Sequence, residues 1–96
     1  MNQIKFKYWN CIPVFKTYSN GRKSISLIDA KDGSPVANAT LNLPSIELEL
    51  DEVIVKNYSE NEGIRPALIE AGIIGPSLRT VSTGYVTATV HKIINK

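Results

Sequence analysis

Alternation of apolar and polar residues, interrupted by turn residues, is the feature that most limits what this chain can fold into. Near the start, Ile4, Phe6 and Tyr8 alternate with lysines, which predicts a first strand with one apolar face over residues 4 to 8. Pro13 is expected to interrupt the pattern that follows. A chain built from short alternating segments of this kind folds as strands that are joined by tight turns.

Further strands are predicted between residues 14 and 43. Residues 14 to 18 and 23 to 29 flank Asn20-Gly21, a pair that supplies the positive φ angles of a tight hairpin. In the next segment, residues 35 to 43, Ala37, Ala39, Leu41 and Leu43 are expected to face inward, and Asn38, Thr40 and Asn42 outward.

The second half of the chain contains three more extended segments. Residues 46 to 50 alternate Ile and Leu with Glu, which fits either a short edge strand or an extended crossover, and Val53 to Val55 form a β-branched run typical of a buried strand. Residues 78 to 82 and 85 to 93 complete the set. In the last strand we expect Val86, Ala88 and Val90 to point inward, and Tyr85, Thr87, Thr89 and His91 to point outward.

One helix is predicted, over residues 63 to 71, with Gly72 as its left-handed C-terminal residue. A start at Ser59 would form a capping box with Glu62, which is worth about 1 kcal/mol. That start would also place Pro66 in the helix interior, at a cost of about 3 kcal/mol. The helix is therefore expected to begin near Gly63, after a separate turn over residues 59 to 62.

These elements predict an α+β fold with a mostly antiparallel meander of five to six strands and one short helix. Because 96 residues are enough for one domain and too few for two, residues 1 to 96 are expected to form a single domain. A lone cysteine excludes an intramolecular disulfide, and the charged N-terminus lacks the apolar run of a signal peptide. The sequence predicts a cytoplasmic protein with no membrane span.

The formal net charge of +2 is too small to indicate a nucleic-acid-binding protein, but the charges are segregated along the chain. Residues 5 to 31 carry six cations against Asp29, and residues 47 to 62 carry six carboxylates against Lys56. In the first strand the lysines alternate with the aromatic residues, so cations and rings are expected on opposite surfaces. This argues against a groove for stacked bases and against direct nucleic-acid binding.

Catalytic and metal-binding chemistry is not indicated. Cys11 is expected to be a small buried apolar residue, and His91 to lie on the polar side of its strand, which disfavours a nucleophile and base pair. On an extended segment the carboxylates of residues 47 to 52 would lie about 7 Å apart, too far for one small ion. We expect no enzyme activity, no catalytic residue, no metal and no cofactor.

Two surfaces are candidates for binding a partner. One is an acidic edge, and the other is a polar loop with an exposed tyrosine, which is a typical hot-spot residue. Two arginines could anchor either surface. The candidate residues are Glu47, Glu49, Asp51 and Glu52 for the edge, Tyr58, Glu60, Asn61 and Glu62 for the loop, and Arg65 and Arg79 as anchors.

Several stretches of the sequence resemble a family of small uncharacterised proteins that bacteriophages, plasmids and conjugative elements of Gram-positive and gut bacteria carry. They run from Leu27 to Ala37, Ala39 to Pro44, Asp51 to Val53, Lys56 to Gly63, Ala71 to Ile73 and Thr83 to Val86. The resemblance covers residues 14 to 90 and departs at Pro66, where the similar proteins continue a helix straight on. The family is a domain of unknown function, so no catalytic residue can be transferred from it.

The resemblance implies a mobile-element accessory protein that acts in the host cytoplasm. The leading hypothesis is an inhibitor of a host defence system, anti-CRISPR-like or anti-restriction-like, which binds and occludes a host protein such as a nuclease effector. One alternative is a sponge that traps a nucleotide signal in a dimer interface near Arg65, Arg79 or Tyr58. The other is a small nucleic-acid-binding regulator that uses the N-terminal cations, and a homodimer is compatible with each of these functions.

Overall fold

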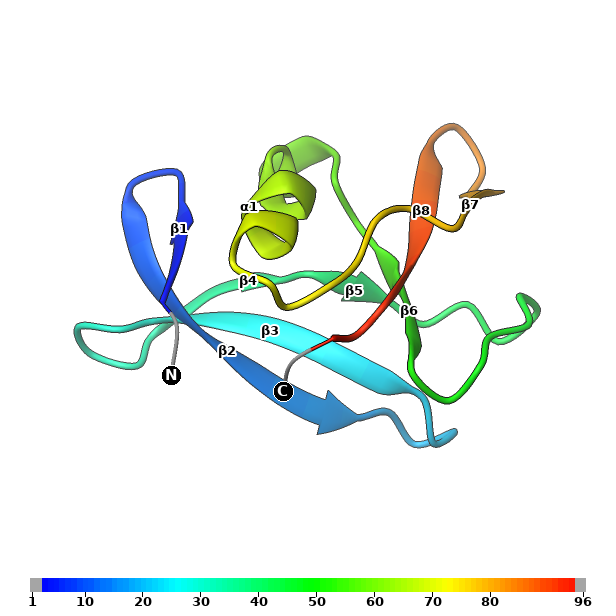
Figure 1. Cartoon of the computed structure of the whole chain (residues 1–96), viewed down its shortest axis with the longest axis horizontal. Helices are drawn as coiled ribbons and strands as arrows, with labels where there is room; N and C mark the ends of the chain where they lie inside the picture. Colours follow the sequence, from blue (N-terminus) through cyan, green and yellow to red (C-terminus); the bar gives the residue numbers. More distant parts are fainter. Residues whose placement is uncertain (1–2, 95–96) are drawn as a thin grey trace.

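The computed structural model describes residues 3–94 and arranges them in two four-stranded antiparallel sheets (Figure 1). The first sheet has the order β1-β2-β3-β4, with β1 at Ile4–Phe6, β2 at Trp9–Thr17, β3 at Lys23–Asp29 and β4 at Pro35–Asn38. The second has the order β5-β6-β8-β7, with β5 at Thr40–Leu41, β6 at Glu52–Val55, β7 at Arg79–Ser82 and β8 at Thr87–Lys92. The α+β class and the antiparallel pairing agree with the prediction. The strand count does not, because the described residues contain eight strands in place of five or six.

The first additional strand arises at the N-terminus, where the chain reverses at Lys7 and Tyr8. Phe6 pairs with Trp9, so β1 and β2 form a hairpin with a two-residue turn, and Lys7 has a φ of 54°. Ile4 and Phe6 are buried as predicted, but Tyr8 is 92% exposed. The expectation that Tyr8 faces the core is therefore wrong, because Tyr8 belongs to a turn and not to a strand.

Pro13 does not interrupt β2, although the sequence predicted a break there. In the β2–β3 hairpin the N–H of Tyr18 donates to the carbonyl of Arg22 at 2.7 Å. Hydrogen-bonded pairs alternate along an antiparallel ladder, so the backbone of Pro13 is directed away from β3. Beyond Cys11 no strand of the described residues pairs with that side of β2. The missing N–H of Pro13 therefore costs no bond to another strand of residues 3–94.

The hairpin at Asn20-Gly21 forms as predicted, with one difference in its turn. Only Gly21 has a positive φ, of 86°, and its N–H donates to the carbonyl of Tyr18 at 2.9 Å. The loop is thus a three-residue connection closed by a left-handed glycine, a common alternative to the two-residue turn.

The predicted strand over residues 35 to 43 is divided between the two sheets at Ala39. The N–H of Ala39 donates to Ile25 in the first sheet at 2.8 Å, and its carbonyl accepts from Lys56, at the end of β6, at 2.9 Å. Thr40, predicted to face outward, is buried. Its Oγ1 accepts a hydrogen bond from the N–H of Ile25 at 3.2 Å. Ala39 is therefore the point where one sheet passes into the other.

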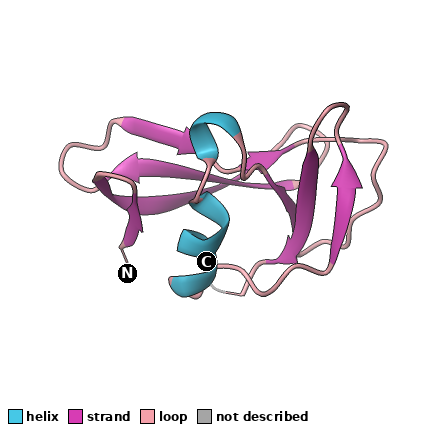
Figure 2. Ribbon diagram, turned by 90° about the horizontal axis from the view of Figure 1, so that it is seen from above, coloured by secondary structure: helices cyan, strands magenta, loops and turns pink. Residues whose placement is uncertain are grey.

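The helix agrees with the prediction. A separate 3₁₀ turn, η1, spans Ser59–Asn61, and α1 spans Ile64–Glu70 after Gly63, which has a φ of 94°. Pro66 lies in the first helical turn, where its missing N–H is tolerated. Figures 1 and 2 place α1 between the β1–β2 hairpin and the second sheet. This position lets the helix contribute to a core that both sheets share.

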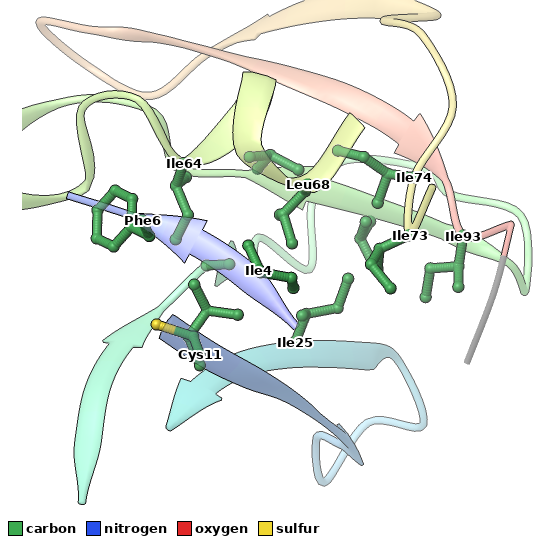
Figure 3. Close-up of a cluster of buried hydrophobic side chains, with 13 residues drawn as sticks. Ile4, Phe6, Cys11, Ile25, Ile64, Leu68, Ile73, Ile74 and Ile93 are labelled. Atoms are coloured by element: carbon green, nitrogen blue, oxygen red, sulfur yellow. The ribbon is translucent and has the colours of Figure 1, made fainter. Parts of the chain in front are cut away.

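The main core lies between the first sheet, α1 and one face of the second sheet. Figure 3 shows Ile64 and Leu68 of α1 directed toward Ile4 and Ile25 of the first sheet, with Ile73, Ile74 and Ile93 beside them. A smaller cluster lies on the other face of the second sheet. It consists of Ile54, Ala88 and Val90, with Leu41 and Val81 of the same sheet beside them and Leu43, Ile46 and Leu48 of the following loop packed against them. The second sheet is consequently buried on both faces.

This double burial explains why the outward prediction for Thr89 and His91 is wrong. In the β6–β8 ladder His91 lies opposite Val53, and Thr89 opposite Val55, and both valines belong to the main core. Residues directly opposite each other share a face. Thr89 and His91 therefore face the main core, and Ala88 and Val90 face the smaller cluster, so neither set faces water.

Candidate functional site

The predicted acidic edge is a folded loop and not a strand. Residues 43–51, which we call the acidic loop, form all of the connection between β5 and β6 except Asn42, and they contain two turns. One turn is closed by Ile46 N–H donating to Leu43 at 3.0 Å, and the other by Glu52 N–H donating to Glu49 at 3.1 Å. The alternation of residues 46 to 50 therefore places Leu48 over the smaller core cluster, without forming either an edge strand or an extended crossover.

Two arginines hold the acidic loop to the rest of the molecule. The guanidinium of Arg22, from the β2–β3 turn, donates to the carbonyls of Leu43, at 2.7 Å, and of Ile46. The guanidinium of Arg79, from β7, donates to the carbonyl of Glu47 at 2.8 Å. Both arginines thus satisfy backbone acceptors of the loop. Arg79, a candidate partner anchor by sequence, is engaged within the chain.

Glu52 is also used inside the molecule. It is only 7% exposed, and its Oε1 accepts from Arg79 at 3.1 Å and from the N–H of Glu49 at 3.0 Å. These two hydrogen bonds, the one from Arg79 with the larger effect, hold the pKa of the Glu52 carboxyl below its ordinary value. Asp51, half-buried, forms a longer ion pair with Lys92 at 3.6 Å. Of the four predicted acidic residues, only Glu47 and Glu49 remain exposed without an ion pair among residues 3–94.

An apolar residue that the sequence reasoning missed lies beside these carboxylates. Leu50 is 89% exposed and stands between Glu49 and Asp51. Two hollows flank this part of the loop, with volumes of about 400 and 260 Å³. Both are lined by Arg22, Leu48, Glu49 and Glu52. The alternation places Leu50 on the apolar side of the segment with Ile46 and Leu48, so no sequence signal marked it as exposed.

The Tyr58 loop is held more closely than predicted. Tyr58 is half-buried, and the Nζ of Lys56 lies 5.5 Å from its ring centroid and 2.7 Å from Glu60 Oε1. Asn61 is 2% exposed and donates to the carbonyl of Asn38 at 2.7 Å. The structure thus uses Glu60 and Asn61 to fix η1 against its neighbours. Glu62 is exposed, and Arg65 is half-buried.

His91 and Cys11 do not form a catalytic pair. His91 is fully buried, with Nδ1 2.8 Å from the carbonyl oxygen of Gly75 and Nε2 2.8 Å from Thr89 Oγ1. The carbonyl can only accept, so Nδ1 donates and Nε2 accepts from the threonine hydroxyl. Both ring nitrogens are occupied. Cys11 is buried in the main core as predicted, and burial raises the pKa of its thiol.

The pH dependence of stability reports on His91, the one histidine of the chain. Burial, reinforced by the charge of Arg65, lowers its pKa from the ordinary 6.5. Below that value the unfolded chain binds a proton that the folded chain does not. The contribution of neutral His91 to the free energy of unfolding is therefore complete above pH 6.5. It is lost as the pH falls toward the folded pKa, with a slope of at most about 1.4 kcal/mol per pH unit. Urea unfolding at pH 7 and pH 5 measures this slope, and equal slopes for the wild type and His91→Gln would contradict it.

Within residues 3–94, no cluster of three or more His, Cys, Asp or Glu side chains is arranged to hold a metal ion. No helix in that range is long and apolar enough to span a bilayer. Searches of protein-family models, curated proteins and solved structures found no match to this chain. The candidate site therefore rests on the geometry of the acidic loop.

Proposed function

We propose that the protein is a non-enzymatic inhibitor of a host defence system, which binds a host protein through the acidic loop and occludes its nucleic-acid channel. The observation that carries this proposal is Leu50, which is 89% exposed on a loop that Arg22 and Arg79 hold in place. Exposed carboxylates at Glu47 and Glu49 accompany it. An apolar side chain among negative charges fits a partner surface that is basic and contains an apolar pocket.

The physical argument is preorganisation. A loop that is already fixed loses little conformational entropy on binding, so more of the contact energy appears as affinity. The unpaired charges of Glu47 and Glu49 would speed association with a basic surface and select among partners, and Leu50 would supply the apolar contact. A nucleic-acid channel of a nuclease is a basic surface of this kind. The resemblance to mobile-element proteins adds the biological setting, a defence system of the host.

A nucleotide sponge is less well supported. Arg79 lines a hollow together with Glu47, Glu49 and Glu52, and these carboxylates disfavour an anionic nucleotide. Arg65 and Tyr58 line none of the four hollows of the described residues that we identified. A thermal-shift screen with cyclic and linear nucleotides tests this alternative, because a tight ligand raises the melting temperature.

The occlusion proposal predicts a specific effect of charge reversal on the loop. In a panel of purified bacterial defence nucleases, the wild-type chain is expected to co-elute with its target and reduce its cleavage rate. The double variant Glu47→Lys/Glu49→Lys and the variant Leu50→Ser should each weaken that complex about tenfold or more, because each removes a central contact.

Two controls locate the effect. Glu70→Lys reverses an exposed charge on α1 and should leave binding unchanged. Tyr58→Ala removes the other predicted face. If Tyr58→Ala abolishes binding while the loop variants bind normally, the acidic loop is not the interface, and if no nuclease in the panel binds or slows, the proposed function fails.

A further inference from the structure

Two aromatic side chains lie exposed in contact with each other at the tip of the β1–β2 hairpin. Tyr8 is 92% and Trp9 38% exposed. Their ring centroids are 6.3 Å apart and the ring planes are inclined at 71°. Neither residue belongs to either core cluster. Adjacent exposed rings of this size are typical of binding surfaces rather than of solvated strands.

A hollow of about 550 Å³ adjoins the two rings. Besides Tyr8 and Trp9, it is lined by Gln3, Asn10, Asp29, Ala30 and Lys31. The rings offer apolar faces on which a planar group can stack. The amides of Gln3 and Asn10 both donate and accept hydrogen bonds, and the Asp29 carboxylate accepts them. Stacking faces beside mixed donors and acceptors match a nucleobase, which has a flat surface and a polar edge.

One lysine lines this hollow, and a second lies opposite one of its lining residues and lines a neighbouring hollow. Lys31 lines it directly, and Lys5 lies opposite Asn10 in the β1–β2 ladder, on the same face of the sheet. Both lysines are exposed, and neither forms an ion pair within the described part of the chain. Asp29 is the one carboxylate among the lining residues, and its Oδ1 accepts from the N–H of Lys31 at 2.9 Å. The two lysines therefore attract the phosphates on either side of a bound base.

The hairpin tip is held in one conformation by the residue at its turn. Lys7 adopts a φ of 54°, which is uncommon for a residue with a side chain. Its Nζ donates to the carbonyl of Glu60 at 2.7 Å and lies 5.2 Å from the ring centroid of Phe6. Phe6 is 3% exposed and pairs with Trp9. The aromatic pair is therefore anchored to the core and to η1 before any ligand binds.

We infer that this hollow binds single-stranded nucleic acid, with one base stacked on the ring of Tyr8 and its edge against Trp9, and with the flanking phosphates beside Lys5 and Lys31. The argument from alternation, which placed cations and rings on opposite surfaces, does not apply to Tyr8, because Tyr8 lies in a turn. The site is separate from the acidic loop, which lies at the other end of the long axis (Figure 1). It therefore stands or falls independently of the proposed inhibitor function.

The experiment uses the fluorescence of Trp9, the single tryptophan of the chain. The full-length protein is titrated with oligo(dC) and oligo(rC) of about a dozen nucleotides, enough to span one binding groove. We expect saturable quenching that weakens as salt is raised. For two phosphate contacts the logarithm of the affinity should fall with the logarithm of salt at a slope of about −1.4. The DNA and RNA arms show which sugar the site accepts.

Variants separate stacking from charge attraction, with anisotropy of a labelled oligonucleotide as the readout. Tyr8→Ala is expected to weaken binding about tenfold, because loss of a stacking ring is worth roughly that factor. Lys5→Gln/Lys31→Gln should weaken binding and flatten the salt dependence. Tyr85→Ala is the matched control, since Tyr85 is fully exposed in the connection between β7 and β8 and should have no effect.

Three results would overturn the inference. The first is no quenching and no anisotropy change with either oligonucleotide at low salt. The second is binding that Tyr8→Ala leaves at the wild-type level. The third is equal binding, with equal sensitivity to Tyr8→Ala, of heparin, a polyanion without bases, since attraction of charge alone would then account for the site.

Discussion

Leu68→Ala is expected to lower the free energy of unfolding by about 3 kcal/mol, because a fully buried leucine leaves a cavity when it is truncated. Leu68 projects from α1 into the main core, toward Ile4 and Ile25 of the first sheet (Figure 3). The cavity would lie where the helix joins the two sheets, so neighbouring elements have little freedom to close it. Chemical denaturation followed by circular dichroism measures the loss.

Ile69→Ala is the matched control on the same helix. Ile69 is 39% exposed, so its truncation should cost less than about 1 kcal/mol. Because the main core contains residues of both sheets, Trp9 fluorescence and circular dichroism should report one transition in each protein. Equal losses for the two variants would show that α1 is not docked through Leu68, and separate transitions would show that the two sheets unfold independently.

The part of the fold that the sequence predicted well depends on residues with strong local preferences. Gly63 and Pro66 together determine where α1 begins, since a proline is tolerated only in the first turn. Gly72, with a φ of 75°, ends the helix as predicted, and Gly21 closes the β2–β3 hairpin. Proline fixes its own φ, and glycine adopts a positive φ without the steric cost that other residues have. The same conformations are favoured in any tertiary context, which is why they could be predicted.

The orientation of the second sheet could not be predicted, because alternation identifies two faces without showing what covers each of them. Ala88 and Val90 were assigned to the core, which left Thr89 and His91 for solvent. The acidic loop covers the face of Ala88 and Val90, and the main core lies against the other face. His91 can be buried without an unsatisfied polar atom, because Thr89 and Gly75 form hydrogen bonds with both of its ring nitrogens. The hydrogen bond between His91 and Gly75 joins residues 16 positions apart, and no sequence pattern predicts it.

For the candidate surfaces too, the sequence predicted exposed charges but not the tertiary contacts of the other residues. The exposed carboxylates of Glu47 and Glu49 were predicted correctly, since isolated charges rarely enter a core. The partner of Glu52 is Arg79, 27 residues away, and no periodicity links the two positions. The turn at Lys7 and Tyr8 was missed because neither residue is typical of turns. Tertiary contacts, including the bond from Lys7 to Glu60, hold that turn.

Arg79→Ala is expected to lower the free energy of unfolding by about 2 kcal/mol at neutral pH, because it leaves the Glu52 carboxylate buried without its cation. The Arg79 side chain is 44% exposed, so the effect should be smaller than for a fully buried pair. Since Arg79 also holds the carbonyl of Glu47, the acidic loop should become mobile. Denaturant unfolding gives the loss, and faster amide hydrogen exchange in residues 43–51 reports the released loop.

A double-mutant cycle with Glu52→Gln assigns the loss to the pair. If the unpaired charge is the cause, Arg79→Ala should cost about 1 kcal/mol or less in the Glu52→Gln background. The pH dependence of the free energy of unfolding gives an independent check, because the pKa of Glu52 in the folded protein lies below its ordinary value of 4.5. The stability from this pair is complete above that value and is lost as the pH falls through the folded pKa, so the wild type should lose more than Arg79→Ala on acidification. Identical losses in both glutamate and glutamine backgrounds would mean that Arg79 acts through the carbonyl of Glu47 alone.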